Sequence, residues 1–351
     1  MNRLIISIIL LVFLNNCSFN ENSQLWKNKE NKLEADKNIK KLFSEDKKVV
    51  SEFNQNLKLD LSKIKINNQI IYNQNSFGSQ NYNGQLNKIT KYKFSKFEEI
   101  DKLNFRPVFL ENGIIFFNKK GSIIRYDNKG KVIWKKNYYS KAEKKLKPKL
   151  NFLIDNQNLL VFDSIAKYYS VNLKTGELNW AKNNTYSFNS DIKKYKDKMF
   201  VVDYENTLRC YKILDGEECW NLQTEDTFTI SNVKYSLILL NDSVIFSNSI
   251  GDITAVDIET GIITWQLPTQ NSSIINEIYN FKISKIVSDG NSLFFSNNKN
   301  EFYSIDAKTG ATNWINKIKS NLKPILVENL IFTISNEGYL YVVDKNKGNI
   351  L

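Results

Sequence analysis

A tryptophan recurs along this chain with a glycine four residues before it, and this repeat restricts the possible folds more than any other feature. The pairs are Gly130 and Trp134, Gly176 and Trp180, Gly216 and Trp220, Gly261 and Trp265, and Gly310 and Trp314. Successive tryptophans stand 46, 40, 45 and 49 residues apart, and five of the chain's six tryptophans obey the rule. A unit recurring every ~40 to 50 residues is typical of proteins built from stacked structural repeats.

Each unit consists of short apolar runs of the kind that form β-strands. An alternating segment precedes each glycine, as at 253–257 and 302–306, and two further apolar runs come before it, as at 236–240 and 244–246. Four strands per unit, with no helical periodicity between them, predict an all-β fold: a β-propeller of four-stranded blades. We expect the glycine to adopt positive φ in the turn between the third and fourth strands, and the Asp that precedes it to accept turn N–H groups.

The tryptophans could form a cofactor platform or could be structural. One tryptophan per unit at a fixed offset favours the structural role, a large apolar plate between neighbouring blades. A sixth copy of the unit begins at Gly338, reaches Gly348 and stops at Leu351, before the position where its tryptophan would stand. We therefore expect the sequence to be truncated at its C-terminus. Residues 83–88 are a faint further echo of the repeat.

The N-terminus is predicted to be an export signal. An apolar stretch of eleven residues, 4–14, follows Arg3 and is too short to span a bilayer. The sequence Leu14-Asn15-Asn16-Cys17 resembles a lipobox, in which Cys17 would be lipidated; an ordinary cleavable signal with an incidental cysteine is the alternative. We expect residues 1–17 to be signal peptide and lipobox, 18–60 a polar tether that could add an edge strand, and 61–351 the propeller.

The consensus Asp-x-x-Thr-Gly-x-x-x-Trp, present at 257–265 and 306–314, resembles the PQQ-type propeller repeat. Combined with the lipobox and the polar tether, it resembles the BamB family, lipoproteins of the machinery that inserts β-barrels into the outer membrane. The resemblance implies eight blades, of which six are visible here. It also implies a non-enzymatic scaffold held by an N-terminal lipid (palmitate) on the periplasmic face of the outer membrane, as a monomer within a hetero-complex.

The same resemblance implies a partner surface. In the BamB family, connectors between blades contact the POTRA domains of the barrel-inserting protein, and the matching connectors here are about 221–235 and 266–283. Phe228 and Ile230 in the first resemble an apolar binding patch, although both could instead be a buried strand pair. Family acidic positions align near Asn280 and Lys282 in the second, and neither residue is acidic here.

Composition bears on the alternatives to a scaffold. The chain has no histidine, which removes the usual general base and a common metal ligand. It has neither the vicinal cysteines of PQQ-dependent dehydrogenases nor a calcium-loop spacing, so we expect no cofactor and no metal. A quinoprotein dehydrogenase and another envelope-protein scaffold remain the alternatives.

The net charge of +12 is spread among many asparagines instead of being gathered into a stripe, so nucleic acid is not an expected partner. An anionic membrane surface is a secondary possibility. The densest lysine run, 141–149, is predicted to be a solvated loop.

Cys210 and Cys219 flank a tight turn at 213–216. If the hairpin pairs evenly, the two cysteines lie opposite each other and could form a cross-strand disulfide. The alternative is two free, buried thiols.

Overall fold

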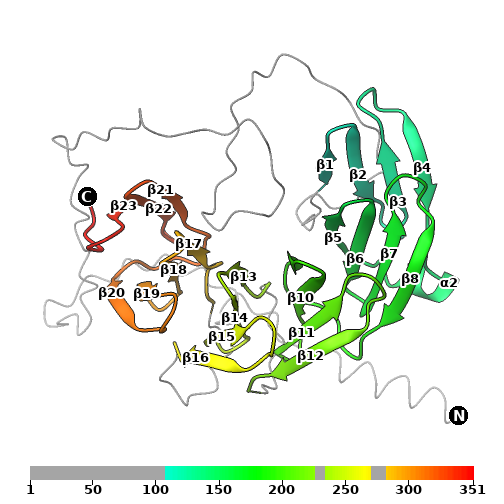
Figure 1. Ribbon diagram of the computed structural model, residues 1–351. Helices are drawn as coiled ribbons and strands as arrows, with labels where there is room; N and C mark the ends of the chain where they lie inside the picture. Colours follow the sequence, from blue (N-terminus) through cyan, green and yellow to red (C-terminus); the bar gives the residue numbers. More distant parts are fainter. Residues whose placement is uncertain (1–106, 226–233, 270–281) are drawn as a thin grey trace, which may run out of the picture. The chain divides into compact units, whose positions relative to one another are not determined.

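The computed structural model describes residues 107–225, 234–269 and 282–351. These residues form six antiparallel sheets that follow one another along the chain (Figure 1). Within each sheet the strands lie side by side in sequence order, so every connection inside a sheet is a hairpin. The predicted all-β fold with six visible blades is confirmed. The N-terminal signal, Cys17, the tether and the echo at 83–88 lie outside the described residues.

The first blade contains β1 (Val108–Leu110), β2 (Gly113–Phe117), β3 (Ile123–Tyr126) and β4 (Val132–Lys136). The second contains β5 (Leu150–Asp155), β6 (Asn158–Asp163), β7 (Lys167–Asn172) and β8 (Leu178–Asn183). The third contains β9 (Lys193–Tyr195), β10 (Lys198–Val202), β11 (Thr207–Lys212) and β12 (Glu218–Gln223). The fourth contains β13 (Leu237–Leu240), β14 (Ser243–Ser247), β15 (Ile253–Asp257) and β16 (Ile263–Leu267). The fifth contains β17 (Val287–Ser288), β18 (Ser292–Ser296), β19 (Phe302–Asp306) and β20 (Thr312–Asn316). The sixth has three described strands, β21 (Ile325–Val327), β22 (Leu330–Ile334) and β23 (Leu340–Asp344).

One helix interrupts the described strands, and it corrects the loop expected at 141–149. Helix α2 (Lys141–Lys145) is held at its start by a capping box. The Ser140 hydroxyl accepts a hydrogen bond from the Glu143 N–H, and the Glu143 carboxylate accepts one from the Ser140 N–H. A Ser followed three residues later by Glu is the sequence signature of a capping box. This cap stabilises the short helix although most of its residues are lysines. No described helix has the length and apolarity needed to cross a membrane.

The middle strands of the blades are buried on both faces. In β10, for example, the side chains of Met199, Phe200, Val201 and Val202 are all fully buried. Five of the six hydrophobic clusters among the described residues are shared by two successive blades: Phe200 of the third blade, for example, packs in one cluster with Phe246 of the fourth. A strand buried on both faces needs a neighbouring sheet on each side, so a single blade would expose its core.

The repeat tryptophans and glycines meet between blades, in a contact we call the Trp–Gly latch. Each indole packs on the repeat glycine of the next blade, and the pairs are Trp134 with Gly176, Trp180 with Gly216, Trp220 with Gly261, Trp265 with Gly310, and Trp314 with Gly348. A Cβ added to Gly310 would lie 2.6 Å from Cε3 of Trp265, closer than side chains tolerate. The predicted interblade position of the tryptophans is therefore confirmed, and each glycine also makes room for an indole.

The glycines have the predicted backbone conformation as well. Gly130, Gly176, Gly216, Gly261 and Gly310 all have φ between 71° and 80°. The predicted Asp turn is also confirmed, since Asp257 Oδ1 accepts the N–H groups of Glu259 (3.1 Å) and Thr260 (2.8 Å). The hydroxyl and N–H of Thr260 lower the pKa of the Asp257 carboxyl.

Four of the five indoles also donate a hydrogen bond across the latch. Their Nε1 atoms lie 3.0 to 3.3 Å from a backbone carbonyl of the next blade, those of Leu173, Ile213, Ala307 and Lys345. The Nε1 of Trp220 is buried and finds no hydrogen-bond partner among the described residues. The latch therefore depends on the packing of the indole on glycine more than on this hydrogen bond.

The cysteine hairpin does not have the even pairing that the disulfide alternative required. A β-bulge falls between Cys210 and Tyr211, so Cys210 pairs with Trp220 and Tyr211 with Glu218, which leaves Cys219 as the extra residue. The same bulge recurs between the third and fourth strands of each of the first five blades. Both cysteines are free thiols. Burial and the neighbouring Cys219 thiol raise the pKa of the Cys210 thiol far above its usual value.

Candidate interaction surface

The predicted docking residues lie in the two connectors between blades, mostly outside the described residues. Phe228, Ile230 and Asn280 fall in 226–233 and 270–281, which the structure does not describe. Lys282 is described and is exposed at the end of the second connector. The residues at the feet of both connectors are described, and they show how each connector is held.

A second repeated turn, which we call the polar turn, joins the second and third strands at the end of each sheet from which the connectors leave. Its first residue is Asn118, Asp163, Asp203, Asn248 or Asn297 in the first five blades. In each, the Oδ1 atom accepts the backbone N–H groups of the residues two and four positions later, at 2.8 to 3.2 Å. The residue three positions later has positive φ, and it is Gly121, Ala166, Asn206, Gly251 or Asn300.

Asn206, in the polar turn of the third blade, holds the start of the first connector. Its backbone carbonyl accepts hydrogen bonds from the N–H (3.2 Å) and the hydroxyl (3.1 Å) of Thr224, and its Nδ2 donates to the Glu225 carbonyl at 2.9 Å. Its side chain also exchanges two hydrogen bonds with Ser249 of the fourth blade, at 2.9 and 3.0 Å. One buried amide thus joins two blades and fixes the last described residues before 226–233.

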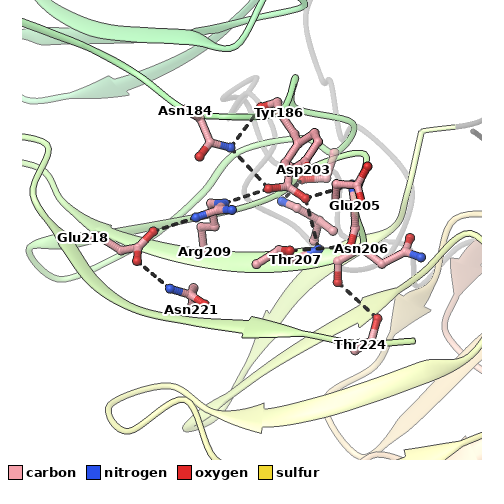
Figure 2. A network of polar contacts seen from close by, with 12 residues as sticks. Asn184, Tyr186, Asp203, Glu205, Asn206, Thr207, Arg209, Glu218, Asn221 and Thr224 are labelled. Carbon is pink, nitrogen blue, oxygen red and sulfur yellow. Dashed lines mark hydrogen bonds and ion pairs between the residues drawn. The ribbon is translucent and has the colours of Figure 1, made fainter. Parts of the chain in front are cut away.

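The carboxylate of Asp203 is the centre of a polar network behind this turn (Figure 2). Asp203 is fully buried, and its Oδ2 accepts hydrogen bonds from Nε of Arg209 (2.7 Å) and Nδ2 of Asn184 (3.2 Å). Arg209 also donates a hydrogen bond from Nη1 to Oε2 of Glu218 at 2.9 Å. Glu218 in turn accepts a hydrogen bond from Nδ2 of Asn221 at 2.6 Å. A buried carboxylate is stable only when paired, and here a guanidinium and two backbone N–H groups pair it.

The other end of the first connector is held by the segment that precedes β9 of the third blade. The Tyr235 N–H donates to the Asn189 carbonyl at 2.8 Å, and Ser190 and Tyr235 form a parallel bridge. Glu225 and Lys234, the described residues on either side of 226–233, are therefore both anchored to the blades. Binding residues placed on a loop that a rigid scaffold holds in this way are a common arrangement in proteins.

The second connector has the same design. At its start the Thr269 hydroxyl donates to the Gly251 carbonyl at 2.7 Å, in the polar turn of the fourth blade. At its end Lys282 and Asn298 exchange two hydrogen bonds at 3.0 Å, in the polar turn of the fifth blade. Lys282 is therefore held through its backbone while its side chain remains exposed.

Burial raises the pKa of two carboxyl groups at this end of the blades. Burial raises the pKa of the Asp252 carboxyl, and the charge of Glu225 raises it further. In the second blade, burial raises the pKa of Asp163, whose Oδ2 accepts a hydrogen bond from the Tyr139 hydroxyl at 2.6 Å. Within the described residues, no three His, Cys, Asp or Glu side chains come together as a group that could hold a metal ion.

The prediction from sequence missed the polar turn, although a signal for it exists. Its first residue stands 13 residues before the repeat glycine in the second to sixth blades, from Asp163 and Gly176 to Ser335 and Gly348, and 12 residues before it in the first. The residue type varies among Asn, Asp and Ser, so the pattern appears only when the copies are aligned on their glycines.

Three comparisons with known proteins point to the same family. Residues 119–351 match the family model described as outer membrane protein assembly factor BamB. The outer membrane protein assembly factor BamB of Shewanella oneidensis is 25% identical over 146 residues, which cover 39% of this chain. The matched part spans about a third (34%) of that relative's length.

Two solved structures share the fold. The crystal structure of BamB from Moraxella catarrhalis superposes with a TM-score of 0.60 at 17% identity, covering 70% of this chain and 74% of that one. The computationally designed Ika8 protein gives a TM-score of 0.53 at 12% identity, covering 67% of this chain and 69% of that one.

Proposed function

The chain belongs to the family of outer membrane protein assembly factor BamB, and on that premise we propose that it is a non-enzymatic scaffold of the machinery that inserts β-barrels into the outer membrane. It docks through its connectors, 221–235 and 266–283, on the POTRA domains of the barrel-inserting subunit. The observation that carries this proposal is the family match over 119–351, which contains both connectors.

The described feet of the connectors support the choice of docking surface. Asn206 and Asn298 hold the described ends of the two connectors, at Glu225 and Lys282, and a binding surface that is anchored before binding loses less conformational freedom when it binds. Phe228 and Ile230 of the first connector then supply an apolar anchor of the kind that dominates protein interfaces, and Lys282 of the second connector supplies a charge.

We further propose that the protein is a lipoprotein. Cys17 carries the lipid, and the chain is held on the periplasmic face of the outer membrane, monomeric within its hetero-complex. Cys17→Ser should abolish incorporation of labelled palmitate and release the protein from the membrane fraction. Labelled palmitate on the Cys17→Ser protein would refute lipidation at this residue.

Docking is tested by affinity capture with purified POTRA domains. The double variant Phe228→Asp with Ile230→Asp should lose at least ten-fold in affinity and keep the circular dichroism spectrum and melting temperature of the unaltered protein. The control is Leu214→Asp, which replaces an apolar side chain by one carboxylate at a position that is 87% exposed, in a turn at the opposite end of its blade. Its affinity should stay within two-fold.

Two results would contradict the docking proposal. Full-length lipidated protein that captures no barrel-inserting subunit from solubilised membranes would remove the assembly role. A double variant that unfolds would show that Phe228 and Ile230 belong to the core, which was the alternative interpretation of this pair.

A further inference from the structure

A basic segment follows the outer strand of the first blade. Residues 127–149 hold nine lysines and two acidic residues, Asp127 and Glu143. More than half of the chain's net charge of +12 is therefore found in this short segment. Eight of the nine lysines are exposed. The positive charge is thus more concentrated here than its spread along the whole sequence suggested.

The two acidic residues of the segment are engaged in other contacts. Asp127 Oδ1 accepts two backbone N–H groups of its own turn, both at 2.8 Å. The Glu143 carboxylate accepts the Ser140 N–H and forms an ion pair with Lys167 at 3.2 Å. Within the part of the chain that the structure describes, none of the nine lysine ammonium groups forms an ion pair.

Exposed apolar side chains stand among these lysines. Val132 and Ile133 of β4 are 46% and 47% exposed, and Leu146, directly after α2, is 64% exposed. The strand β4 is at the edge of its sheet, and α2, which has no buried residue, follows it after four residues (Figure 1). We call the exposed residues of 129–136 and 141–149 the basic strip.

The outer strands of the other four-stranded blades lack this combination. The strand β8 has one lysine, Lys182, which contacts Glu217, and β12, β16 and β20 have none. Lysines on an edge strand can prevent unwanted pairing with another strand. Because four equivalent edges have one lysine or none, edge protection does not explain the lysines of β4 and of the residues that follow it.

From this arrangement we propose that the basic strip is a docking surface for an anionic lipid membrane. Lysine ammonium groups near such a membrane are attracted to its negative surface, and each adds to binding. Exposed apolar side chains between them can enter the boundary between headgroups and acyl chains. A nucleic acid backbone would match the charge but offers no apolar layer. The strip belongs to the first blade, whereas the proposed docking connectors leave the third and fourth blades.

Vesicle binding by the full-length chain tests the proposal. Cys17→Ser is present in every variant, so that the proposed lipid does not add to binding. Cosedimentation measures the partition coefficient on phosphatidylcholine vesicles with and without phosphatidylglycerol, in 0.1 M sodium chloride. We expect binding to the anionic vesicles to be at least ten-fold tighter than to the neutral ones. This preference should disappear in 0.5 M sodium chloride, because salt screens exposed charges.

Two fourfold variants remove the same charge from different places. The strip variant changes four of its exposed lysines: Lys131→Gln, Lys135→Gln, Lys141→Gln and Lys145→Gln. The matched control changes four exposed lysines of the third, fifth and sixth blades: Lys212→Gln, Lys308→Gln, Lys317→Gln and Lys347→Gln. With unchanged melting temperatures, the strip variant should bind anionic vesicles at least ten-fold more weakly than the unaltered protein. The control should stay within three-fold, because charges more than about 10 Å from the membrane are screened.

A further pair of variants tests the apolar side chains at constant charge. Ile133→Ser with Leu146→Ser should weaken binding to anionic vesicles at least three-fold. The matched control, Leu214→Ser with Ile262→Ser, changes side chains that are 87% and 67% exposed in other blades, and should bind within two-fold.

Three results would overturn the proposal. Equal binding of the unaltered protein to neutral and anionic vesicles would remove the membrane site. Equal weakening in the strip and control variants would show that only net charge matters. A strip variant that binds vesicles normally but captures less POTRA protein would make the strip a contact for an acidic protein. Affinity for purified POTRA domains, measured on the same variants, should be unchanged, which separates a failure of this proposal from a failure of the docking proposal.

Discussion

The two ends of each blade are built from different chemistry. At one end the turn between the third and fourth strands contains a glycine that receives the indole of the preceding blade. At the other end the polar turn and the connectors meet through hydrogen bonds, as Asn206 does with Thr224 and Glu225. The latch end repeats one residue pair five times, whereas the polar end varies its residues from blade to blade.

This difference shows what each contact demands. An indole lying on a backbone leaves no space for a Cβ, so only glycine serves at the latch. The polar turn needs only an oxygen that accepts two N–H groups, and Asp203 and Asn248 both provide one. The end with looser demands can therefore differ between blades, and it is the end at which we propose that the partner docks.

The largest effect is expected where a Cβ is forced into a latch. Gly310→Ala should lower the free energy of unfolding by about 3 kcal/mol, because the methyl group meets Trp265 at 2.6 Å and the backbone has φ of 73°. The matched control, Gly338→Ala, has φ of 91° but no atom within 4 Å of the added Cβ, and should cost about 1 kcal/mol. Urea unfolding measures both. Equal losses would mean that the indole contact adds nothing to backbone strain.

An intermediate effect is expected at the polar end. Asp203→Asn keeps the acceptor that Asn248 and Asn297 use in the same turn, but it removes the charge that faces Arg209. Because Arg209 is only 15% exposed, we expect a loss of about 2 kcal/mol in thermal or urea unfolding. Glu218→Gln, at the more exposed end of the same network, should cost less than half of that. If Asp203→Asn left the free energy of unfolding unchanged, the side chain would contribute to stability through its turn hydrogen bonds and not through its charge.

A smaller effect separates two latches. Trp265→Phe removes the hydrogen bond from Nε1 to the Ala307 carbonyl at 3.2 Å, whereas the Nε1 of Trp220 has no such partner among the described residues. Trp265→Phe should therefore be more destabilising than Trp220→Phe by about 1 kcal/mol. Parallel urea titrations of the two variants give the difference directly. A larger loss for Trp220→Phe would contradict this account of the latch.

The smallest effect is expected for an ion pair that crosses the second latch. Lys182 contacts Glu217, and the Glu217 side chain is 63% exposed. Solvent screens such a pair, so Lys182→Met should change the free energy of unfolding by at most about 0.5 kcal/mol. That change should vanish in 1 M sodium chloride. If Lys182→Met lowered the free energy of unfolding as much as Gly310→Ala does, the latch would be stabilised mainly by the ion pair and not by packing.

The fold could be predicted from the sequence because the latch requires Gly and Trp at the same spacing in every repeat. Gly and Trp cannot be exchanged for other residues there, so the spacing from Gly130 to Trp314 remained visible along the chain. The hairpin register was not predictable by even pairing, since the bulge beside Cys210 shifts it by one residue. The partner of each indole could not be predicted either, because the glycine that receives it lies about 40 residues downstream.

The candidate sites were harder to predict than the fold. The polar turn accepts Asn, Asp or Ser, so its repeat is not visible without aligning the blades. The ion pair of Asp191 with Lys285 joins residues 94 positions apart in the sequence, and no local spacing marks it. The capping box of α2 was readable from Ser140 and Glu143, and only the surrounding lysines suggested a loop.

The central claim is that the connectors bind the POTRA domains and that the Trp–Gly latch only holds neighbouring blades together. Hydrogen exchange of the protein with and without purified POTRA domains tests this claim most directly. Our account predicts that binding slows exchange in peptides covering 221–235 and 266–283 and leaves unchanged the latch turns, such as 173–178 and 307–312. Slowed exchange confined to the latch turns, or no change anywhere under conditions of saturating partner, would contradict it.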